Sequence, residues 1–127
     1  MPEPARTGII QRPIARIFIQ GAKKEWHIFR VYIDSGADIS LLRRNDAELL
    51  GLSLTQGEYH PIMGVGKILI PAYTHTIKMR IGDTELDVKA AFADSDEVPR
   101  LLGRTDIFTH FRITFSEKDL EIVFETT

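Results

Sequence analysis

One short polar motif stands out because it interrupts an apolar stretch of the chain. Asp34, Ser35 and Gly36 follow the strand-like run 31–33, and a second apolar run begins at Ile39. Burying an ionised carboxylate between apolar segments costs several kcal/mol unless hydrogen bonds or a shared proton relieve it. We therefore interpret Asp34 as a candidate catalytic acid. The alternative is a solvent-facing turn, since Asp, Ser and Gly are also common turn residues.

The neighbourhood of this motif resembles a known enzyme family. Residues 32–38, Tyr-Ile-Asp-Ser-Gly-Ala-Asp, are similar to the active-site signature of the retropepsin-like aspartic proteases, in which two apolar residues precede Asp-Thr/Ser-Gly-Ala. A glycine-containing hairpin tip at 63–66 and an apolar-apolar-Gly triplet at 101–103 follow in that family's order. The resemblance implies an all-β, retropepsin-like acid protease barrel with one or two short helices and a glycine-tipped flap hairpin. The longer segment 43–52 is more like cellular or bacterial relatives.

The resemblance also implies a role for each matching residue. Asp34 would be catalytic, and the residues supporting its loop would be Ser35, Gly36, Ala37, Asp38 and Arg104. Asp38 and Arg104 would form an ion pair, with two unrelated solvated charges as the alternative. The substrate-binding residues would be Gly36, Met63, Gly64, Val65, Gly66, Val98, Pro99 and Leu101. For Leu101, a purely structural role in the core is an equally good interpretation.

The chemistry of such an enzyme constrains its assembly. Two carboxylates must lie about 3 Å apart and share one proton. One chain offers one suitable aspartate, because Asp83 is followed by a glutamate where glycine is needed, and Asp94 and Asp96 lie in a loop without apolar flanks. The second carboxylate must then come from a second copy across a two-fold axis. A homodimer is therefore expected. The resemblance implies that N- and C-terminal strands form a sheet between the two chains, with residues 122–124 as a candidate strand.

The sequence thus predicts an aspartic endopeptidase that cleaves peptide or protein substrates through two Asp34 residues. An alternative is a non-catalytic dimerisation or peptide-binding module that keeps the fold. A third interpretation is an aspartic hydrolase acting on something other than peptide. The intact Asp-Ser-Gly motif argues mildly against the non-catalytic module, which would have no reason to hold two carboxylates together.

Composition bears on the number of domains, on the possible ligands and on the location of the protein. The 127 residues are 43% hydrophobic and 27% charged, which predicts one folded domain over 1–127, with 1–13 as a flexible or edge arm. A formal charge of -2 without a basic stripe gives no reason to expect nucleic acid. The chain has no cysteine, and its four histidines lack metal-ligand spacing, so neither a metal nor a cofactor is expected. The absence of a signal peptide or a membrane segment predicts a cytoplasmic protein.

Strand and helix signals complete the expected fold. Alternating apolar residues predict hairpins from 14–20 with 25–33, from 76–81 with 85–92 and from 112–115 with 120–124. The flap arms are expected at 54–62 and 67–73. A capping box formed by Asn45 and Glu48 predicts a helix over 46–50. A second short helix is expected over 106–111 with Thr105 as its cap.

Overall fold

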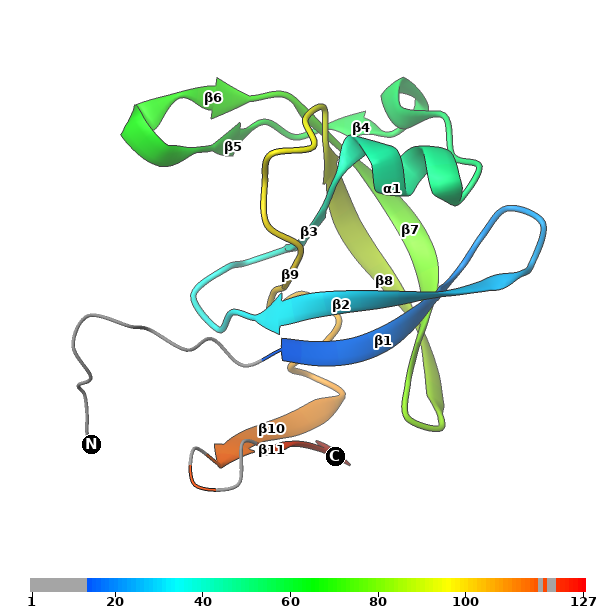
Figure 1. Ribbon diagram of the computed structural model, residues 1–127, viewed down its shortest axis with the longest axis vertical. Helices are drawn as coiled ribbons and strands as arrows, with labels where there is room; N and C mark the ends of the chain where they lie inside the picture. Colours follow the sequence, from blue (N-terminus) through cyan, green and yellow to red (C-terminus); the bar gives the residue numbers. More distant parts are fainter. Residues whose placement is uncertain (1–13, 117, 119–120) are drawn as a thin grey trace.

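Strands dominate the chain (Figure 1). The computed structural model describes residues 14–116, 118 and 121–127, so the arm predicted at 1–13 lies outside the described part. The strands are β1 (Ile14–Gln20), β2 (Trp26–Ile33), β3 (Ser40–Leu42), β4 (Glu58–Tyr59), β5 (Ile62–Met63), β6 (Leu69–Ile70), β7 (Ala72–Ile81), β8 (Thr84–Ala93), β9 (Leu101–Leu102), β10 (Phe111–Ser116) and β11 (Glu121–Thr126). The helical segments are α1 (Arg44–Leu49) and the single 3-10 turns η1 (Leu54–Gln56) and η2 (Val65–Lys67). The all-β expectation is confirmed.

Six strands form a closed barrel in the order β1-β2-β9-β3-β8-β7, and pairing of β1 with β7 closes it. Buried residues alternate along β1 and the first half of β8, as the sequence pattern predicted, whereas residues 90–93 at the end of β8 are all buried. They meet in one apolar core, where Ile17, Ile19, Val88 and Phe92 are fully buried. Burying a side chain of this size contributes about 1.5–3 kcal/mol, so the core fixes the barrel and with it the ends of β2 and β9.

The predicted β1–β2 and β7–β8 hairpins are confirmed. The β7–β8 strands are longer than predicted, because the turn needs only Gly82 and Asp83 and because residues 72–75 continue the pairing with residues 90–93 of β8. Gly82 has a φ of 60°, which favours glycine and suits a two-residue turn. The β7–β8 hairpin therefore forms a long, rigid wall of the barrel.

The flap arms are shorter than the predicted ranges 54–62 and 67–73. Pro61 and Pro71 interrupt them, because proline has no N–H to donate to a strand ladder. The first arm divides into η1, β4 and β5, and β4 pairs with β7 while β5 pairs with β6. Figure 1 shows the β5–β6 hairpin projecting beyond the barrel.

The helix α1 begins two residues earlier than predicted, and its cap differs from the predicted one. The N–H of Arg43 donates to the Asp46 carboxylate at 2.9 Å, so Asp46 takes the place expected for Glu48. Asp46 is buried, and Arg100 forks onto both of its oxygens at 2.9 and 3.0 Å. This carboxylate raises the pKa of the Arg100 guanidinium above its ordinary value. A buried ion pair thus ties α1 to the segment before β9.

The prediction of a second helix over 106–111 is wrong. Residues 105–110 form successive turns instead, with the Phe108 and Phe111 N–H groups donating back to Arg104 and Ile107. Asp106 has a φ of 66°, which no α-helix accepts, and its carboxylate receives the N–H of Lys89 at 2.9 Å. The contact with β8 therefore outweighs the local helical preference, and α1 is the one α-helix of the described residues.

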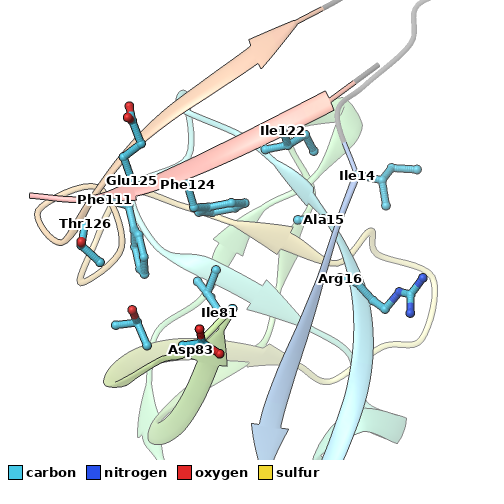
Figure 2. Close-up of a pocket in the computed structure, with 12 residues that line it drawn as sticks. Ile14, Ala15, Arg16, Ile81, Asp83, Phe111, Ile122, Phe124, Glu125 and Thr126 are labelled. Carbon is cyan, nitrogen blue, oxygen red and sulfur yellow. The ribbon is translucent and has the colours of Figure 1, made fainter. Parts of the chain in front are cut away.

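The last two strands form a separate hairpin, β10–β11, which contains the predicted terminal-strand residues 122–124. Phe111 and Phe124 meet edge to face, with their ring centres 5.6 Å apart. A cavity of about 740 Å³ lies between this hairpin, the start of β1 and the β7–β8 turn, and Figure 2 shows residues that line it. Within the described ranges, no helix has the length and apolar content needed to cross a bilayer.

Candidate active site

Asp34 lies directly after β2, at the start of the turn that leads to β3. Its N–H donates to the carbonyl of Leu102 at 3.0 Å, and its own carbonyl accepts the N–H of Ala37 at 3.2 Å. The half-buried carboxylate accepts the N–H of Gly36 at 2.9 Å. The local backbone therefore fixes both the position and the orientation of the carboxylate, while Ser35 and Gly36 remain exposed beside it.

The short strand β9 holds this turn from the other side of the sequence. It runs between β2 and β3, with Leu101 and Leu102 beside Tyr32 and Ile33 in parallel register. Beyond it, the N–H groups of Arg104 and Thr105 donate to the carbonyls of Ala37 and Asp38 at 2.9 and 2.8 Å. Ala37 and Asp38 thus belong to the loop support, but through their backbone carbonyls.

The position after the apolar pair 101–102 has room only for glycine. The N–H of Gly103 donates to the buried Ser40 hydroxyl at 3.0 Å. A Cβ at this position would lie 2.5 Å from the carbonyl carbon of Ile39 and 2.6 Å from its oxygen. Backbone atoms cannot move aside as a flexible side chain can, so the close crossing of the two loops requires glycine.

We expect Gly103→Ala to lower the free energy of unfolding by about 1–3 kcal/mol, the usual cost of overpacking a tight site. Gly66→Ala is the matched control, because a Cβ there meets no atom within 4 Å and adds only the strain of a φ of 77°. Urea unfolding followed by tryptophan fluorescence measures both variants. Equal losses in the two would show that the crossing at Gly103 is not sterically tight.

The predicted ion pair between Asp38 and Arg104 does not form among the described residues of this single chain. Both side chains are exposed, and the Arg104 guanidinium lies over the Phe108 ring, 5.0 Å from its centre. The two segments are joined by the backbone hydrogen bonds of Arg104 and Thr105 instead. Backbone bonds of this kind need no particular side chain, so no sequence motif reveals them.

A pocket of about 280 Å³ lies beside the carboxylate and is lined by Tyr32, Ile33, Asp34 and Leu101. Leu101, one of the predicted substrate-binding residues, is among these lining residues. Tyr32 and Ile33 were not among the predicted substrate-binding residues, because they line the pocket through the pairing of β2 with β9. Ile33 and Leu101 are the apolar lining residues, whereas Tyr32 and Asp34 both carry polar groups.

A second apolar cluster connects two of the predicted substrate-binding residues, Val98 and Leu101, to the base of the flap. Val98 is buried there with four residues of β3, β7 and β8, namely Leu41, Ala72, Ala91 and Ala93. Ile39, Ile62, Ile70 and Leu101 pack against it. Because Ile62 and Ile70 come from β5 and β6, the cluster anchors the flap to the wall that includes Leu101. Pro99, in contrast, is exposed.

The flap tip consists of residues 63–68. The N–H of Gly64 donates to the carbonyl of Ile68 at 2.7 Å and closes the tip, and Gly66 supplies a positive φ inside η2. Met63 and Ile68 are 63% and 65% exposed, which is unusual for side chains of this type. The tip therefore carries exposed apolar side chains on an irregular backbone.

Among the described residues, no three His, Asp or Glu side chains are grouped so as to hold a metal ion. The site offers a carboxylate that the backbone positions beside a small pocket. A carboxylate in such a place acts as an acid or a base toward a bound water or carbonyl.

Comparison with known proteins agrees with this geometry. Residues 21–105 match the family model described as aspartyl protease, whereas no curated protein matches the chain. A retropepsin-like aspartic protease from Rickettsia conorii is similar in structure, with a TM-score of 0.65 and 24% identity over 87% of this chain and 88% of that one.

Two further solved structures share the fold. The retroviral protease-like domain of Ddi1 from Leishmania major has a TM-score of 0.64 and 13% identity over 92% of this chain and 90% of that one. The EIAV protease, solved in complex with the inhibitor HBY-793, has a TM-score of 0.57 and 20% identity over 79% of this chain and 88% of that one. The predicted retropepsin-like fold is thus confirmed. Because the family match covers more than half of the sequence, this chain belongs to the aspartyl protease family.

Proposed function

We propose that the protein is an aspartic endopeptidase whose catalytic pair consists of Asp34 from each of two identical chains. The observation that carries the proposal is the position of the Asp34 carboxylate. It accepts the Gly36 N–H at 2.9 Å, and hydrogen bonds to β9 and to the residues after it hold the turn that carries it. Ser35 and Gly36 are exposed on the same turn, so a second chain has access to it. Membership of the aspartyl protease family supports the same chemistry.

The need for a second chain follows from what surrounds Asp34. The pocket beside it contains no other carboxylate, since its remaining lining residues are Tyr32, Ile33 and Leu101. Two carboxylates about 3 Å apart cannot both be ionised, so they share one proton. The ionised member accepts a proton from water as the water attacks the scissile carbonyl, and the protonated member donates to the carbonyl oxygen.

Substrate would lie as an extended strand between this pair and the flap. The backbone at Gly64, Val65 and Gly66 would bond to the peptide backbone by strand addition, with Met63 covering the peptide. Leu101 would form the wall of a side-chain pocket, and Val98 and Pro99 would border it. Ser35 would brace the two turns across the symmetry axis. The β10–β11 hairpin supplies the terminal strand for the dimer, because within the described residues β11 pairs only with β10.

Mixing wild-type protein with the Asp34→Asn variant tests the shared pair directly. A fourfold excess of the variant should convert most wild-type chains into mixed dimers with one intact aspartate, so hydrolysis of an unfolded protein should fall about fivefold by simple pairing statistics. Cleavage is followed by fluorescence release from a labelled casein at a fixed wild-type concentration.

Wild-type protein diluted without the variant serves as the control. It should lose activity per chain only where sedimentation shows dissociation, because the site is complete only in the dimer. Undiminished activity in the fourfold mixture, with exchange between dimers verified, would refute a shared pair. A folded dimer that cleaves nothing would instead support a non-catalytic binding module.

A further inference from the structure

Residues 94–100, which we call the crossover segment, connect β8 to β9. They form bends between the two strands, and they include Val98 and Pro99, two of the predicted substrate-binding residues. Leu101, which lines the pocket beside Asp34, follows directly. Because β9 has only two residues, the position of Leu101 depends also on what holds the crossover segment.

Arg43 holds the crossover segment by its backbone. It follows β3 directly, and its guanidinium Nε donates to the carbonyl of Val98 at 2.6 Å. A hydrogen bond from a charged donor is stronger than one between neutral groups. The backbone N–H of Arg43 donates to the Asp46 carboxylate at 2.9 Å. Arg43 thus fixes the Val98 carbonyl relative to the start of α1.

A second contact holds the crossover segment two residues further on. The Arg100 guanidinium forks onto Asp46, and the Arg100 carbonyl accepts the N–H of Tyr32 at 2.9 Å. One oxygen of Asp46 accepts both Nε of Arg100 and the N–H of Arg43. The backbone is therefore held on both sides of Pro99, and the end of the crossover segment and the start of α1 form one hydrogen-bonded unit.

The Val98 side chain connects this unit to the pocket beside Asp34. Val98 is 6% exposed and belongs to the apolar cluster against which Leu101 packs. Leu101 also lies opposite Leu41 in the register of β3 with β9. Because protein interiors are close-packed, a shift of one member of such a cluster is felt by its neighbours. Release of the Val98 backbone would therefore let Leu101 shift as well.

We propose that Arg43 is a positioning residue that determines which size of apolar side chain the pocket beside Asp34 accepts. The inference rests on the proposed function, since it concerns the peptide cleaved at that carboxylate. Arg43 acts through the Val98 carbonyl and Leu101 and does not touch the substrate. A pocket of fixed shape discriminates between apolar side chains that differ by one methylene by about 10- to 200-fold, whereas a pocket whose wall shifts discriminates less.

Two neutral variants separate the hydrogen bond of Arg43 from its charge. In Arg43→Gln, the amide nitrogen follows Cδ, as Nε does in arginine, so a donor stays within reach of the Val98 carbonyl. Arg43→Met has a side chain of nearly equal length that carries no donor. Since both variants lose the positive charge, a difference between them reports on the hydrogen bond to Val98.

Peptides that share one cleavage site measure the size preference. They carry either Leu or Ala at each of the two residues that flank the cleaved bond, one position at a time. At one of these positions, the wild-type kcat/KM should be at least about tenfold higher for Leu than for Ala. Arg43→Met should reduce this Leu/Ala ratio to about three or less, while Arg43→Gln should keep most of it.

Arg44→Met is the matched control on the same helix. Among the described residues, the Arg44 guanidinium contacts the carboxylates of Asp94 and Asp96, each at 3.3 Å, rather than the backbone of the crossover segment. Surface ion pairs of this kind contribute little. This variant removes the same charge as the Arg43 variants and should keep the wild-type Leu/Ala ratio.

Urea unfolding and sedimentation of every variant accompany the assays, so that all ratios are compared between folded dimers. A lower urea midpoint of Arg43→Met with an unchanged Leu/Ala ratio would show a purely structural role and overturn the proposal. Equal losses of the ratio in Arg43→Met and Arg43→Gln, or in Arg43→Met and Arg44→Met, would also overturn it. So would a wild-type ratio near one at both positions.

A binding measurement separates this proposal from the proposed catalysis. Fluorescence anisotropy of labelled Leu and Ala peptides on the Asp34→Asn variant, with and without Arg43→Met, reports the preference without turnover. Tighter binding of the Leu peptide by about tenfold, lowered to about three or less by Arg43→Met, would support the role of Arg43 even if the wild-type protein cleaved nothing. Cleavage with a Leu/Ala ratio that Arg43→Met leaves unchanged would leave the proposed function intact and overturn the role of Arg43.

Discussion

Replacing Asp34 with asparagine is expected to lower kcat/KM for an unfolded protein substrate by about 1,000-fold, because the variant removes the group that moves protons in the proposed reaction. Asparagine keeps an oxygen that accepts the Gly36 N–H, so the turn and the dimer should remain intact. Hydrolysis of labelled casein measures the activity, and sedimentation with circular dichroism measures assembly and folding.

Asp83→Asn is the matched control for this prediction. Asp83 begins the sequence Asp-Thr-Glu, which superficially imitates the active-site motif, but it is exposed in the turn between β7 and β8. Its replacement should leave casein hydrolysis unchanged. Full activity of Asp34→Asn would remove the aspartic protease mechanism as stated, whereas equal losses in both variants would point to general effects of charge.

The largest effect on stability is expected from Asp46→Ala. This change leaves Arg100 without its carboxylate in a partly buried place and the Arg43 N–H without its acceptor. Removing one partner of a fully buried ion pair costs about 3–5 kcal/mol, and because Arg100 keeps 31% of its side chain exposed, we expect a loss of about 3 kcal/mol, at the lower end of that range. Urea denaturation at fixed protein concentration, which also fixes the contribution of any dimer, measures the loss.

Asp94→Ala provides the comparison with an exposed ion pair. Asp94 lies 3.3 Å from Nη1 of Arg44, and both side chains are more than 40% exposed. Surface pairs of this kind contribute about 0–1 kcal/mol, so the variant should unfold close to the wild-type midpoint. A similar loss in both variants would mean that the Asp46 pair is not special and that α1 tolerates the unpaired charge.

The parts of the fold that the sequence predicts are those that contiguous residues determine. The position of Asp34 after a strand followed from seven neighbouring residues, and the hairpins followed from alternation and a glycine turn. The triplet 101–103 was predicted as part of the site because it resembles the apolar-apolar-Gly element of the retropepsin-like proteases, which consists of three consecutive residues. In each case the physical cause lies within a few residues of the effect.

The features that sequence reasoning missed depend on contacts between distant segments. The cap of α1 is set by Asp46, which Arg100 holds from 54 positions away. The helix expected over 106–111 is absent because Asp106 bonds to the backbone of Lys89 in β8. Tyr32 and Ile33 line the pocket only because β9 inserts beside β2. A single sequence carries no local signal for such pairings.

The placement of β9 between β2 and β3 has a consequence for the order in which the chain gains activity. The turn that carries Asp34 is synthesised early, but the residues that lock it, Leu102 to Thr105, follow nearly seventy positions later. Closing so large a loop costs conformational entropy and is slow, so we expect these hydrogen bonds to form late in folding. On the ribosome, the Asp34 carboxylate therefore lies on a turn that is not yet ordered, and hydrolytic competence is delayed until residues 102–105 have been synthesised and have packed against it.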